Sequence, residues 1–185
     1  MDPPVPTVAR APRQTRDQLI HRLDGRYGAL APDEVLETAR ALAGQLDLAS
    51  TDLILGIPEG GTIPAFAVAQ LARLPLVLAT RTVVDITPRI SFQEPHVPDN
   101  SDFHFYGLQR GIRVAIIEDE VTTGRTLVNA VEALRRAGVI VTGVAAFFVV
   151  DHPATRRRLA DAGLDVVSRM AISADFIDRV GADGT

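Results

Sequence analysis

Residues 114–127, Val-Ala-Ile-Ile-Glu-Asp-Glu-Val-Thr-Thr-Gly-Arg-Thr-Leu, predict a strand, a turn and the start of a helix. Four apolar residues form the expected buried strand, and the acids Glu118 and Asp119 follow it. Backbone N–H groups at a helix start bind anions, and the threonine hydroxyls of the turn add donors. Carboxylates at a strand end can accept hydrogen bonds from sugar hydroxyls. The stretch therefore favours a sugar phosphate, bound at the carboxyl ends of the strands of an open α/β sheet.

This stretch closely resembles the signature with which type I phosphoribosyltransferases bind phosphoribosyl pyrophosphate (PRPP). The signature is four apolar residues, two acids, two variable residues, Thr-Thr-Gly, one variable residue and Thr, and every required position is matched. The resemblance implies that Glu118 and Asp119 bind the ribose and act in catalysis, with Asp119 also holding Mg²⁺ through water. It implies that the 5-phosphate is bound by Thr122, Thr123, Gly124, Arg125 and Thr126. A structural turn with a solvated acidic cap is the alternative interpretation.

Length and composition indicate one domain without a membrane span. The 185 residues are near the usual size of a single domain, and no apolar run approaches the roughly 20 residues of a spanning helix. The N-terminus lacks the apolar core of a signal peptide, and there is no cysteine, so we expect a cytoplasmic protein. A net charge of −4 argues against broad nucleic-acid binding. All nineteen basic residues are arginine, which removes lysine from every catalytic role.

Strand-like and helix-like segments alternate along the chain, which predicts an α/β fold. We expect a Rossmann-like parallel sheet of about five strands with helices on both faces, and the resemblance adds a small hood. The expected strands are 53–57, 76–79, 113–117, 140–150 and 164–168. The expected helices are 15–24, one beginning at Pro32, 63–71, one between the signature and Gly138, and 154–162. Residues 1–14 contain four prolines and are expected to form a flexible arm, with 15–185 as a single domain.

Residues 81–111 interrupt this alternation, with three prolines and no sustained period. The segment is too long for an ordinary connection. Its aromatic residues Phe103, Phe105 and Tyr106 are expected to dock it onto the sheet, and stacking on a flat acceptor is the alternative. Type I phosphoribosyltransferases have a long mobile loop at this point, so the resemblance implies a loop that closes and excludes water from a ribosyl cation-like state. Within it, His96 or His104 could exchange a proton near neutral pH, and solvent exposure is the alternative for both.

A second motif follows the first expected strand, where Pro58-Glu59-Gly60-Gly61-Thr62 precedes a helix. Two glycines at a strand end let backbone N–H groups approach an anion closely. The motif resembles the family's diphosphate-binding loop, which often has an unusual peptide geometry, and especially the orotate phosphoribosyltransferase version. The resemblance assigns diphosphate binding to Glu59, Gly60 and Gly61. A purely structural turn is the alternative.

Two arginines are candidates to neutralise the diphosphate in a chain without lysine. Arg81 sits where orotate phosphoribosyltransferases have an arginine that meets diphosphate, so we assign it to diphosphate binding and catalysis. Arg89 could join it as a bidentate clamp when the loop closes. Thr122 also fits the orotate pattern, but residues 82–85 lack the lysines of that subfamily.

The resemblance thus implies a Mg²⁺-dependent phosphoribosyltransferase. It would transfer the 5-phosphoribosyl group of PRPP to a nitrogen of a nucleobase or similar flat aromatic acceptor and release diphosphate. The pattern is orotate-like, and the acceptor is left open. A PRPP-binding regulatory protein without turnover and a PRPP-using enzyme of a specialised pathway are the alternatives. A homodimer is expected, and neither nucleic acid nor membrane is expected as a partner.

Overall fold

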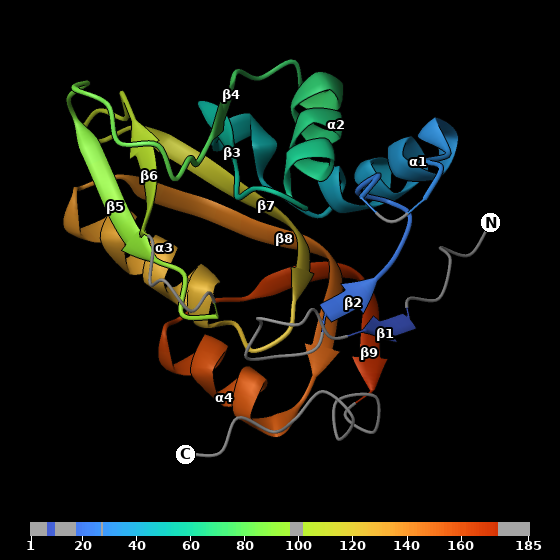
Figure 1. Cartoon of the computed structure of the whole chain (residues 1–185). Helices are drawn as coiled ribbons and strands as arrows, with labels where there is room; N and C mark the ends of the chain where they lie inside the picture. The colour runs from blue at the N-terminus through green and yellow to red at the C-terminus, as the bar shows by residue number, and fades with distance from the viewer. Residues whose placement is uncertain (1–6, 10–17, 27, 97–101, 174–185) are drawn as a thin grey trace.

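A five-stranded parallel sheet forms the centre of the computed structural model, which describes residues 7–9, 18–26, 28–96 and 102–173 (Figure 1). The strand order is β4-β3-β7-β8-β9, and every neighbouring pair is parallel. The strands are β3 Leu53–Gly56, β4 Leu76–Leu78, β7 Arg113–Val121, β8 Ile140–Asp151 and β9 Val166–Ser173. The predicted fold class is confirmed.

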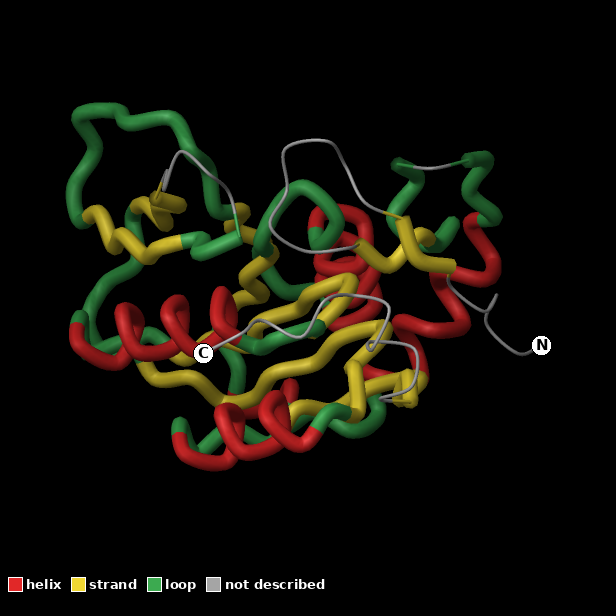
Figure 2. Tube along the Cα trace, turned by 60° about the horizontal axis from the view of Figure 1, so that its bottom comes forward, coloured by secondary structure: helices red, strands yellow, loops and turns green. Residues whose placement is uncertain are grey.

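Helices cover both faces of this sheet (Figure 2). They are α1 Pro32–Ala43, α2 Thr62–Ala72, α3 Arg125–Arg136 and α4 Pro153–Asp161, with a 3₁₀ turn, η1, at Leu48–Ser50. Successive residues of β7 point to opposite faces, so Ile116 packs with the side chains of α3 and Ile117 with those of α1 and α2. In the described part of the chain, no helix has the length and apolarity to cross a bilayer.

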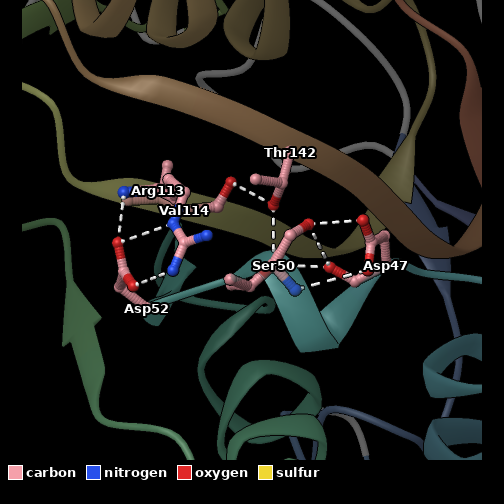
Figure 3. A network of polar contacts seen from close by, with 7 residues as sticks. Asp47, Ser50, Asp52, Arg113, Val114 and Thr142 are labelled. Atoms are coloured by element: carbon pink, nitrogen blue, oxygen red, sulfur yellow. Dashed lines mark hydrogen bonds and ion pairs between the residues drawn. The ribbon is translucent and has the colours of Figure 1, made fainter.

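The amino ends of the central strands are joined by polar contacts (Figure 3). Asp52, just before β3, accepts hydrogen bonds from the backbone N (2.9 Å), Nε (3.2 Å) and Nη2 (2.7 Å) of Arg113 at the start of β7. The side-chain hydrogen bond from Arg113 lowers the pKa of Asp52 to about 2. On β8, Thr142 donates to the carbonyl of Val114 at 3.0 Å. These contacts lie toward the amino ends of the strands and leave the carboxyl ends available for a ligand.

The predicted helix at 15–24 is wrong. Its described part contains β2 Gln18–Ile20, which pairs antiparallel with β1 Thr7–Ala9, and then a series of turns. A ten-residue segment forms a helix only marginally by itself, and pairing with β1 satisfies its backbone instead. The expected flexible arm at 1–14 therefore includes one paired strand, and its remaining residues lie outside the described part.

The segment 81–111 is not one irregular loop. It contains the antiparallel hairpin of β5 Arg89–Gln93 and β6 Asp102–Tyr106. Phe92 lies 5.7 Å from Phe103 and 5.3 Å from Phe105 between ring centroids, and all three rings are buried against the sheet. The expected docking by aromatic residues is thus confirmed for Phe103 and Phe105. The mobility of the segment stays a prediction, and residues 97–101 lie outside the described part.

Candidate functional site

A cavity of about 520 Å³ opens at the carboxyl ends of β3, β4 and β7. It is lined by Arg26, Ile57, Pro58, Glu59, Gly60, Ala79, Thr80, Arg81, Thr82, Glu94, His96, Phe103, Glu118, Asp119, Glu120 and Thr126. Five of these residues carry carboxylates and two are arginines. The cavity is therefore polar and rich in oxygen atoms, the ligand atoms that hard cations such as Mg²⁺ prefer.

A turn connects β7 to α3 beside this cavity. It encloses a smaller space of about 30 Å³, lined by His96, Glu118, Glu120, Val121, Thr122, Thr123, Gly124, Thr126 and Leu127. Gly124 has a φ of +75°, a backbone conformation that favours glycine, and immediately precedes α3. The threonines of the turn thereby stand at a helix N-terminus, the geometry predicted for the 5-phosphate site.

Helix α4 supports this turn from the outside. The hydroxyl of Thr155 donates to the carbonyl of Thr122 at 2.7 Å, and Arg158 Nη1 donates to the carbonyl of Thr123. Arg158, the last of three consecutive arginines on α4, therefore contacts the turn. These contacts satisfy two backbone carbonyls of the turn and tie the turn to α4.

The two acids of the signature lie inside β7 and not after it. The strand continues to Val121 because its partner β8 extends at least as far, with Glu118 opposite Ala146 and Val121 opposite Val149. Glu118 and Asp119 are 7% and 5% exposed. The predicted strand end at 117 was too early, and the acids are held more rigidly than a turn would hold them.

The glycine motif after β3 packs directly on these acids. A Cβ added to Gly60 would overlap the carboxylate of Asp119, and one added to Gly61 would lie 3.1 Å from Glu118 Oε2. The peptide bond between Pro58 and Glu59 is cis, an unusual geometry of the kind that the resemblance implies for this loop. The two motifs, some sixty positions apart in the chain, therefore form one site.

The surroundings of the two acids shift their pKa values in opposite directions. Burial, followed by the neighbouring charge of Asp119, raises the pKa of Glu118 well above its ordinary value. Burial also opposes ionisation of Asp119, but contact with His21 and the positive charge of Arg26 outweigh it and lower the pKa of Asp119. Asp119 is therefore the acid that stays ionised at neutral pH.

The structure contains a polar cluster before α1 that the sequence did not predict, formed by His21, Asp24 and Arg26. Arg26 Nη2 donates to Asp119 Oδ2 at 2.7 Å, and its Nε donates to Asp24 Oδ2. His21 Nε2 lies 3.5 Å from Asp119 Oδ2 and packs against Phe148 with 4.8 Å between ring centroids. No local pattern could reveal this, because Arg26 and Asp119 are 93 positions apart.

This cluster could in principle hold a metal ion. One ligand atom each from His21, Asp24 and Asp119 lie within 4.8 Å of one another. However, the Oδ2 atoms of both aspartates already accept hydrogen bonds from the Arg26 guanidinium. The arginine therefore occupies the position that a cation would take.

The two candidate diphosphate arginines have different positions. Arg81 lines the cavity, and its guanidinium lies 4.1 Å from the centroid of the Phe103 ring. Arg89 is exposed at the start of β5 and is not among the residues that line the described cavity. The hairpin alternates, so Ile90 and Phe92 point inward while Arg89 faces solvent. The structure does not bring Arg89 to the site.

Both loop histidines are buried, so the alternative of simple solvent exposure is wrong. His104 lies within hydrogen-bonding distance of Ser91, with 2.9 Å between Nδ1 and Oγ, and it does not line the described cavity. His96 does line it, and its Nε2 lies 2.7 Å from Thr123 Oγ1. Of the two, only His96 is placed to affect a ligand.

Comparison with known proteins agrees with this geometry. Residues 8–177 match the sequence model of a family described as phosphoribosyl transferase. The chain belongs to the type I phosphoribosyltransferase family. Its fold is similar to that of adenine phosphoribosyltransferase from Thermoanaerobacter pseudethanolicus, with a TM-score of 0.72 and 16% identity over 91% of this chain and 96% of that one.

Curated phosphoribosyltransferases similar to this chain carry different names. A hypoxanthine/guanine phosphoribosyltransferase from Methanocella paludicola is 22% identical over 91% of this chain and 88% of its own length. A xanthine phosphoribosyltransferase from Chloroflexus aurantiacus is 32% identical over 74% of this chain and 67% of its own length. The likeness therefore establishes a phosphoribosyltransferase without selecting one acceptor.

Proposed function

We propose that this phosphoribosyltransferase transfers the 5-phosphoribosyl group of PRPP to a nitrogen of a nucleobase or similar flat aromatic acceptor and releases diphosphate. The proposal rests on the observation that the signature of β7 and the glycine motif after β3 line the same cavity. The acids of the signature lie against Gly60 and Gly61, and the threonine turn adjoins them. That arrangement provides neighbouring places for a diphosphate, a ribose and a 5-phosphate.

The proposed roles follow from the atoms that each group presents. The turn from Thr122 to Thr126 offers hydroxyl and backbone donors to the 5-phosphate at the start of α3. Asp119, ionised at neutral pH, accepts hydrogen bonds from the ribose hydroxyls and stabilises positive charge on the ring. Glu118, whose pKa is raised, can donate as well as accept at the same position.

The diphosphate would lie by Glu59, Gly60 and Gly61, with Arg81 as the neighbouring cation. Carboxylates such as Glu59 repel diphosphate unless a cation lies between them. The carboxylates of the cavity other than Glu118, whose pKa is raised, suit Mg²⁺, which prefers oxygen ligands and keeps several waters, and Asp119 would hold it through one of these waters. When bound, Mg²⁺ neutralises charge on the leaving diphosphate.

The reaction needs no covalent nucleophile from the chain. A nitrogen of the acceptor forms a bond to the anomeric carbon while the bond from that carbon to diphosphate breaks. The side chains hold the reactants in line and stabilise the developing charges, which accounts for most catalysis of this type. Exclusion of water by the segment that contains the hairpin is part of the proposal, because water would compete with the acceptor.

The class of acceptor is supported by the relatives, which are named for hypoxanthine/guanine, adenine, xanthine and orotate. We therefore favour a nucleobase over an acceptor of a specialised pathway. A homodimer is proposed as well, because exposed apolar side chains occur on α2, on β4 and in the segment after β4. They are Phe66, Leu78, Val83, Val84 and Ile86.

The test is product formation across a panel of acceptors. The purified chain is incubated with PRPP, Mg²⁺ and each of hypoxanthine, guanine, xanthine, adenine, orotate and simple aromatic carboxylates, and nucleotide products are identified by mass spectrometry. We expect one class of nucleobase to yield a phosphoribosylated product. PRPP binding without product from any acceptor would favour a regulatory role, and no PRPP binding would contradict the proposal.

A further inference from the structure

The carboxyl end of β5 places an acidic side chain on the turn proposed to bind the 5-phosphate. The hydroxyl of Thr126 donates to Glu94 Oε2 at 2.8 Å, across 32 positions of sequence. The backbone N–H of His96 donates to Glu94 Oε1 at 3.0 Å. Both oxygens of this carboxylate are therefore hydrogen-bonded, one of them by the first turn of α3.

A second contact from the same short segment reaches the turn. His96 Nε2 lies 2.7 Å from Thr123 Oγ1, and His96 is only 6% exposed. Two of the three threonine hydroxyls of the signature are thus engaged by residues that follow β5. The buried aromatic rings of the hairpin hold β5 against the sheet, and the residues that follow β5 are thereby positioned beside the turn.

A carboxylate bound at this position interacts with the same kinds of group as a phosphate. Both are anions, both accept from hydroxyl and backbone N–H groups, and both are favoured at a helix N-terminus. The Thr126 hydroxyl has a single proton to donate. It cannot donate to Glu94 and to a phosphate oxygen at the same time.

We propose that Glu94 is an internal anion that occupies part of the 5-phosphate site in the ligand-free chain and is displaced when the phosphate binds. The proposal rests on the proposed function, which assigns the threonine turn to the 5-phosphate. Two adjacent anions that share one donor repel each other, so the negative charge of Glu94 weakens phosphate binding. Its charge also acts on Glu118, whose pKa it helps to raise. Displacement of Glu94 therefore links occupancy of the phosphate site to the ribose-binding acids.

Calorimetric titration of the full chain with ribose 5-phosphate tests this proposal, because that ligand carries the 5-phosphate without the diphosphate. Glu94→Gln keeps the size of the side chain and removes its charge, and Glu94→Ala removes both charge and acceptor. We expect each variant to bind ribose 5-phosphate about fivefold tighter or more than the unmodified chain. Glu132→Gln on the exposed face of α3 is the matched control and should leave the affinity unchanged.

Thr126→Val separates failure of this proposal from failure of the proposed function. If the turn binds the 5-phosphate, Thr126→Val weakens ribose 5-phosphate binding, and a circular dichroism spectrum like that of the unmodified chain shows that the fold is retained. Unchanged binding in Thr126→Val would overturn the phosphate assignment and this proposal with it. Weaker binding in Thr126→Val, with no gain in either Glu94 variant, would overturn the role of Glu94 alone.

Discussion

Gly60 lies so close to Asp119 that any Cβ at position 60 would overlap the Asp119 carboxylate. The contact joins the loop after β3 to the carboxyl-terminal part of β7, and it brings the proposed diphosphate site against the proposed ribose site. Glycine is needed at position 60 because of this close approach, whereas its backbone conformation does not require it.

Gly60→Ala should therefore weaken PRPP binding by at least about tenfold, because the loop or the Asp119 carboxylate must move to admit a methyl group. Overpacking of this kind also costs about 1–3 kcal/mol of folding stability. Gly44→Ala at the end of α1 is the control, since an added Cβ there meets only ordinary contacts of 3.5 Å and longer. Calorimetric titration and thermal denaturation check both effects, and equal PRPP affinity in the two variants would contradict the proposed role of the contact.

Arg81→Ala should lower the turnover rate at saturating PRPP by about tenfold or more, because Arg81, unlike Arg89, lines the cavity that contains the proposed diphosphate site. Arg89→Ala should have a smaller effect, since Arg89 faces solvent. Steady-state rates of diphosphate release measure both variants. If Arg81→Ala instead raises only the Michaelis constant of the acceptor, Arg81 binds the acceptor and its diphosphate role is wrong.

Glu118→Gln should make the ligand-free chain progressively more stable than the unmodified chain as the pH rises. The folded state raises the pKa of Glu118 above 4.5 mainly by burial, so above about pH 4.5 the unfolded chain loses a proton that the folded chain retains. Ionisation of Glu118 then opposes folding, by up to about 1.4 kcal/mol per pH unit until the raised pKa is passed.

Thermal denaturation between pH 5 and pH 8 measures this difference. Glu132→Gln, which changes an exposed carboxylate, should show no such trend. A difference in melting temperature between Glu118→Gln and the unmodified chain that stays constant or falls with pH would show that burial does not disfavour the Glu118 charge.

The local patterns of the sequence were sufficient for the fold class and for the central site. Continuous apolar runs predicted the strands, and the signature predicted that Glu118, Asp119 and the threonine turn lie together between a strand and a helix. The wrong predictions concern elements whose packing or pairing partners are distant in the sequence. The extension of β7 beyond Ile117 depends on the length of β8, and the hairpin of β5 and β6 depends on rings that pack against the sheet.

The same limit applies to the residues around the site. Arg26 reaches Asp119 across 93 positions, and Glu94 reaches Thr126 across 32, so neither contact has a signal in the local sequence. The position of Arg89 depends on which face of β5 it occupies, and the sequence alone did not show that β5 exists. Which charged side chains belong to the site thus depends on tertiary contacts between distant segments more than on residue type.

Release of diphosphate from PRPP, compared between the unmodified chain and Asp119→Asn, is the most direct test of the central claim. We expect acceptor- and Mg²⁺-dependent release by the unmodified chain and a rate at least about tenfold lower in Asp119→Asn, equivalent to about 1.4 kcal/mol. Circular dichroism should show the same fold in both. Equal rates in two well-folded proteins, or no release with any nucleobase, would show that the proposed phosphoribosyl transfer at Asp119 is wrong.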